Sequence, residues 1–284
     1  MKVFVVVDME GATGVVHRDQ LMPDGRGYSS AQALLTDDVN AVIEGVLAVD
    51  ATATIVVGDG HGTMRNVLLE RIHPCASVVV GGGHPSNKPL LQCEGIDASF
   101  EAAFLLGFHT MAGTPGGLLA HTFVGSTIAR MMINGRAAGE AEVDALILGS
   151  FGVPVLGVVG NSDLEPEIRT WNPTCGFVAT KQVLGPTAAI CKPPARTQAE
   201  ITDMVSAMVR RHYADPVPPY SLGSTVELSA ELYRTEMVDR ISFHGDVKRL
   251  GDRTIATEGP MDLAFRHLWK AIAQALTEPP AWLM

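Results

Sequence analysis

The sequence predicts an α/β protein with a mostly parallel sheet flanked by helices in its N-terminal part and a smaller α+β C-terminal part. Short apolar runs recur along the chain, polar residues and glycines end each run, and a helix-periodic segment separates the first two runs. The composition agrees, since 46% of the 284 residues are hydrophobic, 18% are charged and 29 are glycine. Such a chain is globular and long enough to bury a large core.

Four apolar runs have the length of buried strands, and they lie at residues 3–7, 54–57, 102–106 and 153–159. They contain no charged residue, as expected for strands that helices cover on both faces. Residues 29–48, between the first two runs, place apolar side chains at helix spacing. Strand, helix and strand in this order predict a parallel sheet.

Further helices are expected after the third run. Gly139 and Glu140 follow the turn signal Asn134-Gly135 and open an apolar-periodic segment. A carboxylate in the first helical turn is stabilised by the helix dipole, so helix capping is the simplest explanation of Glu140. A helix is also expected over about 197–213, before a Pro-rich linker and further strand and helix.

The charge pattern argues against two classes of partner. The formal net charge is −10, and the longest basic cluster is the pair Arg210-Arg211, which favours neither nucleic acid nor an anionic membrane. No segment approaches the roughly 20 uninterrupted apolar residues of a transmembrane helix. The first apolar run is too short for a signal peptide and ends at Asp8. We therefore expect a cytoplasmic protein.

Potential metal ligands stand directly after the first three runs. Asp8 and Glu10 are two residues apart, so in an extended segment both carboxylates point to the same side. His61 lies in a Gly-rich loop where Asp59 could orient its ring, and His109 follows the third run. Each residue alone also has a simpler explanation: the two carboxylates could cap a helix, His61 could be an ordinary loop residue, and His109 could be a histidine of the core. Together they favour a metal site, because the carboxyl ends of parallel strands share one edge.

Mixed nitrogen and oxygen ligands without thiolate suit zinc best, with manganese, cobalt or iron as alternatives. Two histidines and three carboxylates are enough for two ions that share a bridging carboxylate, and Asp8 is expected to be the bridge. The predicted metal ligands are Asp8, Glu10, His61, His109 and Glu140.

His121 follows the flexible turn Thr114-Pro115-Gly116-Gly117, which could present it to a substrate. We predict that it is catalytic and either stabilises the oxyanion or transfers a proton to the leaving amine, with a metal-activated water as the nucleophile. A structural histidine at the surface or in the core is the alternative. The fourth run also ends in polar residues, Asn161-Ser162-Asp163, without an assigned role.

Several segments together resemble the DppA-like zinc D-aminopeptidase family in order and spacing. They are Val7-Asp8-Met9-Glu10-Gly11, Asp59 to His61, Leu106-Gly107-Phe108-His109, Leu119-Ala120-His121, and Ile133-Asn134-Gly135-Arg136 with Gly139-Glu140. The resemblance implies two zinc ions per chain, with Asp8 bridging, Glu10 and His109 on one ion, His61 and Glu140 on the other, and His121 as the catalytic histidine. It also implies a homo-oligomer, a decamer of two stacked pentamers, that releases D-amino acids from short peptides.

We therefore predict a dinuclear zinc hydrolase, most simply an aminopeptidase that releases N-terminal amino acids of D configuration from short peptides or amino-acid amides. Residues 1–192 are expected to form the metal-binding α/β domain, and residues 193–284 an α+β region that packs on it or forms oligomer contacts. The alternatives are an amidase for a non-peptide amide, a metal-dependent phosphatase and a binding protein without activity. Two histidines weigh against the phosphatase, whose metals prefer oxygen ligands.

Overall fold

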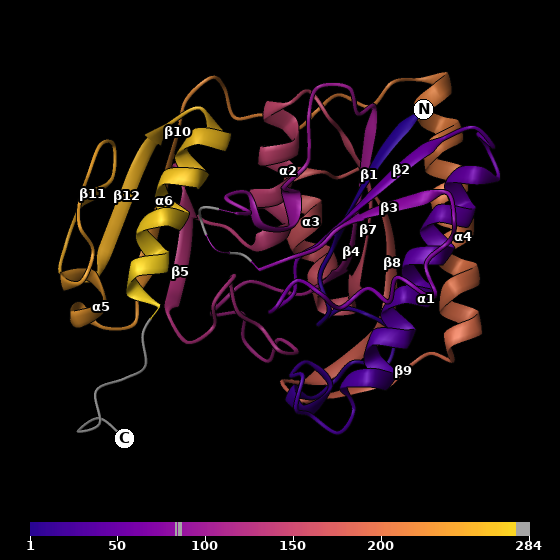
Figure 1. The fold of residues 1–284 in the computed structure, drawn as a ribbon, viewed down its shortest axis with the longest axis horizontal. Helices are drawn as coiled ribbons and strands as arrows, with labels where there is room; N and C mark the ends of the chain where they lie inside the picture. Colours follow the sequence, from indigo (N-terminus) through magenta and orange to yellow (C-terminus); the bar gives the residue numbers. More distant parts are fainter. Residues whose placement is uncertain (83, 85–86, 277–284) are drawn as a thin grey trace.

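Two sheets form the framework of the protein in the computed structural model, which describes residues 1–82, 84 and 87–276 (Figure 1). Neighbouring strands of the larger sheet are parallel, except for the last pair. In spatial order this sheet contains β3 (Ala76–Val79), β2 (Thr54–Asp59), β1 (Lys2–Val7), β4 (Ala102–Phe108), β7 (Val155–Asn161), β8 (Gly176–Gly185) and β9 (Ala188–Cys191). The predicted mostly parallel sheet is confirmed.

The smaller sheet is antiparallel throughout. In spatial order it contains β11 (Lys248–Arg249), β12 (Thr254–Gly259), β10 (Val226–Leu232), β5 (Ile128–Ile133) and β6 (Arg136–Ala137). The short helix α5 (Thr235–Asp239) packs on β10, and the longer α6 (Met261–Ala275) packs on β10 and β12. For the part after the Pro-rich linker, the sequence predicted strands and a helix but not their residue ranges.

The four predicted strands β1, β2, β4 and β7 follow from their apolar composition. Every side chain from Val3 to Val7 is buried, because β1 pairs with β2 on one side and β4 on the other and is covered on both faces. The strand β7 begins at Val155, two residues later than expected. Pro154 accounts for the delay, since proline has no N–H to donate to a ladder.

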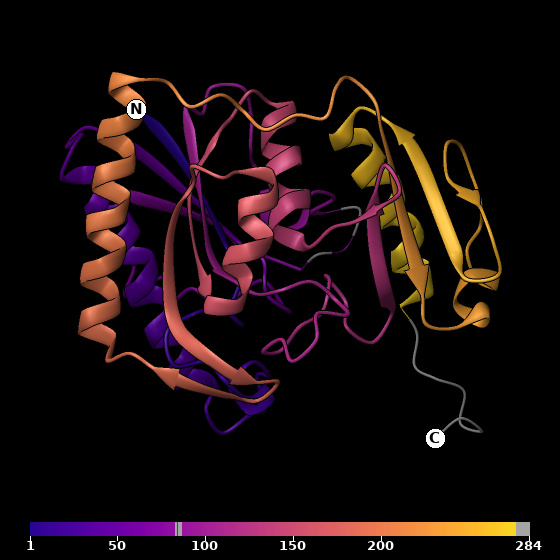
Figure 2. The same cartoon turned by 180° about the vertical axis from the view of Figure 1, so that it is seen from behind.

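Helices separate the two sheets and cover the outer face of the larger one (Figure 2). The outer pair is α1 (Tyr28–Leu47) and α4 (Pro194–Ala214), which pack closely where the Ser206 hydroxyl donates a hydrogen bond of 3.0 Å to the Gly45 carbonyl. Between the sheets lie α2 (Glu140–Ser150) and α3 (Glu165–Trp171). Both predicted helices around residues 29–48 and 197–213 are confirmed. None of the described helices is both long and apolar enough to span a bilayer.

In the described part of the chain, three single-turn 3-10 helices connect these elements: η1 (Arg18–Gln20), η2 (Leu91–Cys93) and η3 (Ser162–Leu164). They lie in the connections that follow β1, precede β4 and follow β7. All three connections carry residues that line or support the functional site described below.

The two sheets do not divide the chain at the predicted boundary between residues 192 and 193. The strands β5 and β6 precede that boundary and belong to the smaller sheet, whereas α4 follows it and packs against α1 on the larger sheet. Long-range pairing causes this difference, since β5 pairs with β10 roughly a hundred residues later along the chain. The last part of the predicted C-terminal region, residues 277–284, lies outside the described residues.

Gly107 holds the ends of β1 and β4 together and has no room for a side chain. Its φ is +84°, and a Cβ atom would lie 1.9 Å from the carbonyl oxygen of Asp8. Its own carbonyl accepts a hydrogen bond of 2.6 Å from the Gly11 N–H. This close approach sets the distance between the segments that carry Asp8 and His109.

We expect Gly107→Ala to lower the free energy of unfolding by about 2–5 kcal/mol, because the substitution combines an unfavourable φ with a backbone clash. Gly152→Ala is the matched control, since Gly152 has a φ of +80° and no atom lies within 4 Å of the position that its Cβ would take. The control should lose only about 1 kcal/mol. Urea denaturation of both variants measures the difference, and equal losses would show that the close approach has no energetic role.

Candidate metal centre

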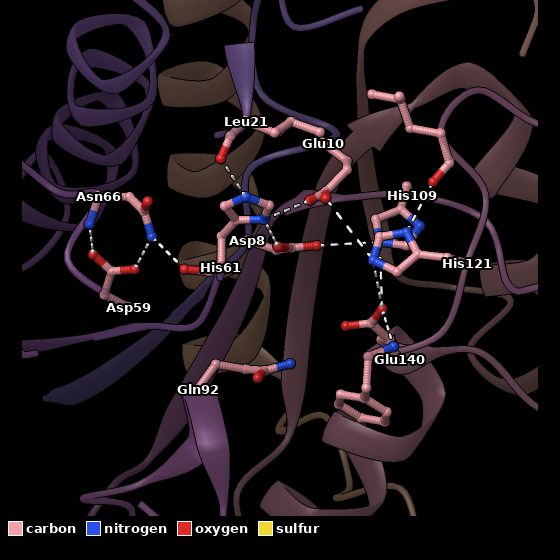
Figure 3. Close-up of polar contacts among 12 residues, drawn as sticks. Asp8, Glu10, Leu21, Asp59, His61, Asn66, Gln92, His109, His121 and Glu140 are labelled. Carbon is pink, nitrogen blue, oxygen red and sulfur yellow. Dashed lines mark hydrogen bonds and ion pairs between the residues drawn. The ribbon is translucent and has the colours of Figure 1, made fainter. Parts of the chain in front are cut away.

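All five predicted metal ligands and His121 meet at the carboxyl ends of the central strands (Figure 3). Asp8 and Glu10 follow β1, His61 follows β2 and His109 follows β4 directly. Glu140 arrives from the opposite side as the first residue of α2. The order of the parallel strands therefore brings together side chains that lie far apart in the sequence.

The ligand atoms form two groups that share Asp8. In the first, His61 Nδ1 lies 3.1 Å from Glu10 Oε2 and 3.4 Å from Asp8 Oδ1. In the second, His109 Nε2 lies 3.3 Å from Asp8 Oδ2 and 3.4 Å from Glu140 Oε1. Each oxygen of Asp8 thus faces a different group, as expected of a bridging carboxylate.

This grouping differs from the one that the family resemblance implied. His61 lies with Glu10 rather than with Glu140, and Glu140 lies with His109. A third set of close ligand atoms joins Glu10 and His109 to His121. The implied pair of Glu10 and His109 thus also lies within one set, and the assignment of ligands to the two ions stays a prediction.

The ring of each histidine is oriented by the main chain. In all three rings one nitrogen lies at hydrogen-bond distance from a backbone carbonyl oxygen: His61 Nε2 from Leu21 at 3.0 Å, His109 Nδ1 from Thr110 at 2.9 Å, and His121 Nδ1 from Leu119 at 2.9 Å. A carbonyl oxygen only accepts, so each of these nitrogens carries the proton. The other nitrogen of each ring faces the carboxylates, which is the orientation a metal ligand needs.

Asp59 does not orient the His61 ring, contrary to expectation. Its carboxylate accepts hydrogen bonds from the backbone N–H groups of Asn66 and Val67 and from the Asn66 side chain. Asn66 in turn donates a hydrogen bond of 2.6 Å to the His61 carbonyl. Asp59 therefore shapes the loop that carries His61, while the Leu21 carbonyl fixes the ring itself.

Glu140 is not a helix cap. The N-terminus of α2 has no side-chain cap, and Glu140 Oε1 accepts a hydrogen bond of 2.6 Å from the Phe123 N–H. The same oxygen faces His109. The contact with Phe123 fixes the carboxylate in a ligand position.

The centre is buried and strongly anionic, which calls for bound cations. The side chains of Asp8, Glu10, His109 and Glu140 are almost completely buried. Asp8 Oδ2 and His109 Nε2 are buried and face each other at 3.3 Å, with no further hydrogen-bond partner among the described residues. Burial alone lowers the pKa of His109 and that of His61, but the adjacent carboxylates outweigh it and raise both pKa values well above the usual range.

The Asp8 carboxyl shows the converse effect. Burial raises its pKa, yet the two histidines outweigh burial and hold the pKa well below its usual range. Protonated histidines would therefore neutralise the carboxylates in the absence of metal, and divalent cations do so when they bind. The mixed nitrogen and oxygen donor atoms and the low exposure both fit zinc.

His121 lies at the border between the ligands and an open cavity. Its ring stacks on that of His109, with centroids 4.2 Å apart and an angle of 10° between the planes. Its Nε2 lies 3.9 Å from Glu10 Oε1 and equally far from Glu140 Oε1. The side chain is 24% exposed, in contrast to the buried His109. It therefore reaches the place where a substrate would lie.

Two residues that had no assigned role hold the segment of His121. The Leu118 N–H donates a hydrogen bond of 3.0 Å to Asp163 Oδ2, and Asn161 Nδ2 donates one of 3.3 Å to the Leu118 carbonyl. Asn161 is the last residue of β7, and Asp163 lies in the 3-10 helix η3 that follows it. The signal for them was the polar ending of the fourth apolar run, the same pattern that identified the ligands.

The cavity beside the centre has a volume of about 520 Å³. Asp8, His61, His121 and Glu140 contribute to one side of it. A buried carboxylate and histidine cluster that opens on a cavity of this size has the properties of a metallohydrolase site.

Comparisons with known proteins identify the family. The D-aminopeptidase family model matches residues 1–269, so the chain belongs to the D-aminopeptidase family. A D-aminopeptidase of Bacillus subtilis (strain 168) is 30% identical over 220 residues, which cover 77% of this chain and 78% of the relative. The predicted family and the predicted class of enzyme, an aminopeptidase, are confirmed.

A solved structure shows the same fold. It is described as the Zn-dependent D-aminopeptidase DppA from Bacillus subtilis, a self-compartmentalizing protease. The TM-score is 0.90 at 25% sequence identity, with 99% of this chain and 100% of that chain covered. The similarity therefore extends over both sheets.

Proposed function

We propose that this protein is a dinuclear zinc aminopeptidase that releases N-terminal D-amino acids from short peptides or amino-acid amides. The observation that carries the proposal is the position of Asp8, whose two oxygens face two separate histidine and carboxylate groups. Membership of the D-aminopeptidase family and the zinc-dependent structural neighbour support the metal and the reaction.

In this proposal one zinc ion would be held by Asp8, Glu10 and His61, and the other by Asp8, His109 and Glu140. Manganese and cobalt are alternative occupants, because the donor atoms also suit them. Bound zinc would supply Lewis acidity, which lowers the pKa of a water molecule and polarises the scissile carbonyl group.

His121 moves a proton in the proposed reaction. Its Nδ1 keeps the hydrogen bond to the Leu119 carbonyl, which leaves Nε2 facing the cavity as the atom that gains and loses a proton. Nε2 takes a proton from the attacking water molecule and delivers it to the amine nitrogen, which leaves as the carbon–nitrogen bond breaks. In its protonated form the same nitrogen donates a hydrogen bond to the developing oxyanion.

We also propose that the chain forms a homo-oligomer, because the structural neighbour is described as self-compartmentalizing. The decamer and the cytoplasmic location stay predictions from the family resemblance and the sequence. Light scattering during size-exclusion chromatography measures the number of chains directly. A monomer would contradict the assembly.

The proposed function is tested with a panel of D- and L-amino-acid amides and short peptides. We expect cleavage that stops after chelation, returns with zinc and is faster for one D-series substrate than for its L enantiomer. Cleavage of L substrates alone would overturn the stereochemical part. Hydrolysis of p-nitrophenyl phosphate without any amide cleavage would favour the phosphatase, and cleavage of non-peptide amides alone would favour the amidase.

A further inference from the structure

The cavity beside the metal centre has one wall that is apolar. The described residues that form this wall come from four different parts of the chain: Met64, Leu91, Phe123 with Val124, and Trp269 with Ala273 and Leu276. Trp269 and Ala273 lie one turn apart on α6, the helix that packs on the smaller sheet. The C-terminal region thus reaches the site, although none of its residues is a predicted ligand.

The charged lining residues of the cavity belong to the metal centre. Among the described lining residues, Asp8 and Glu140 are the only ones with a carboxylate or a basic side chain other than histidine. Gln92 also lines the cavity, but its side-chain amide nitrogen donates a hydrogen bond of 2.8 Å to the buried Asp144. A charged substrate side chain would therefore lose water on the apolar wall without gaining an ionic partner.

We propose that the apolar wall binds the side chain of the substrate's amino acid and that Trp269 and Ala273 set the size it accepts. The preferred substrates are then short peptides or amides with a large aliphatic or aromatic side chain rather than a charged or very small one. This inference rests on the proposed aminopeptidase function, because it requires the scissile bond to lie at the metal centre.

The two α6 residues have complementary positions. Trp269 is only 6% exposed, so its ring forms a fixed part of the wall. Ala273 is half-buried and small, which leaves space in front of it. A larger side chain at position 273 would occupy that space without disturbing the buried face of the helix.

The test measures binding of alanine, leucine, phenylalanine, lysine and glutamate hydroxamates to the zinc-loaded protein by calorimetry, in the D and the L series. Each buried methylene group adds about fourfold in affinity, so leucine hydroxamate should bind at least about 10-fold more tightly than alanine hydroxamate. Lysine and glutamate hydroxamates should bind no more tightly than the alanine compound. The kcat/KM values of the corresponding amides should follow the same order.

Variants test whether Trp269 and Ala273 cause the preference for large apolar side chains. Ala273→Phe should bring the leucine-to-alanine affinity ratio close to one, and Trp269→Ala should weaken leucine hydroxamate by about 10-fold. Leu263→Phe is the matched control, because Leu263 is exposed on the same helix and does not line the cavity. It should leave the ratio unchanged. If Trp269→Ala fails to fold, Ala273→Phe decides the question.

Failure of the proposed function and failure of the proposed side-chain pocket give different results. A high leucine-to-alanine ratio in binding without hydrolysis of any amide would overturn the proposed function and leave the apolar pocket standing. Hydrolysis together with equal binding of all five hydroxamates, or with tightest binding of the lysine or glutamate compound, would overturn the pocket. An unchanged ratio in Ala273→Phe would also overturn it.

Discussion

Replacement of Asp8 by asparagine is expected to reduce bound zinc from the proposed two ions per chain to one or none and to lower turnover by at least about 10³-fold. Asp8 is the ligand that both groups share, so its loss weakens both sites at once. Loss of a residue that merely supports a metal ligand already costs about 10–100-fold, and the loss of a shared ligand should cost more. Zinc analysis by mass spectrometry together with amide hydrolysis measures both effects.

Asp203→Asn is the control for this substitution, because Asp203 lies exposed on α4, which packs on the outer face of the larger sheet. The control should keep both zinc and activity. An Asp8→Asn protein that retains two tightly bound zinc ions would show that Asp8 does not bridge them.

His121→Ala is the second substitution with a large expected effect. Turnover should fall by about 10²-fold to 10⁴-fold, since the variant lacks the group that moves the proton. Zinc content should stay near two ions per chain, because neither group around Asp8 needs His121. Single-turnover kinetics and zinc analysis of the same preparation separate the two properties.

His267→Ala is the matched control, because the His267 side chain is 44% exposed and pairs with Asp246 at the surface. It should behave like the unmodified protein. Loss of zinc from His121→Ala would instead make His121 a ligand, in line with its proximity to Glu10 and His109. Unchanged turnover would remove it from the mechanism.

The sequence was sufficient for the central strands and for the polar side chains that meet where these strands end. Uninterrupted apolar runs predict buried strands, and polar side chains within a few residues of the end of such a run lie at the functional edge of a parallel sheet. This rule located Asp8, His61 and His109 in one place, as the structure shows. It also marked Asn161, whose contact with the Leu118 carbonyl helps to hold the segment of His121.

Other features depend on contacts that leave no signal in the sequence. The carbonyl of Leu21 orients His61 across 40 positions of the chain, and every residue has such a carbonyl. Trp269 looks like any apolar residue on one face of an amphipathic helix, and only the packing of α6 brings it to the cavity. The antiparallel sheet likewise depends on the pairing of β5 with the distant β10.

Zinc-edge anomalous diffraction from crystals of the zinc-loaded protein tests the central claim most directly. We expect two anomalous peaks per chain, one among Asp8, Glu10 and His61 and the other among Asp8, His109 and Glu140, with Asp8 contacting both. A single peak, or a second peak without Asp8 among its ligands, would contradict the dinuclear centre.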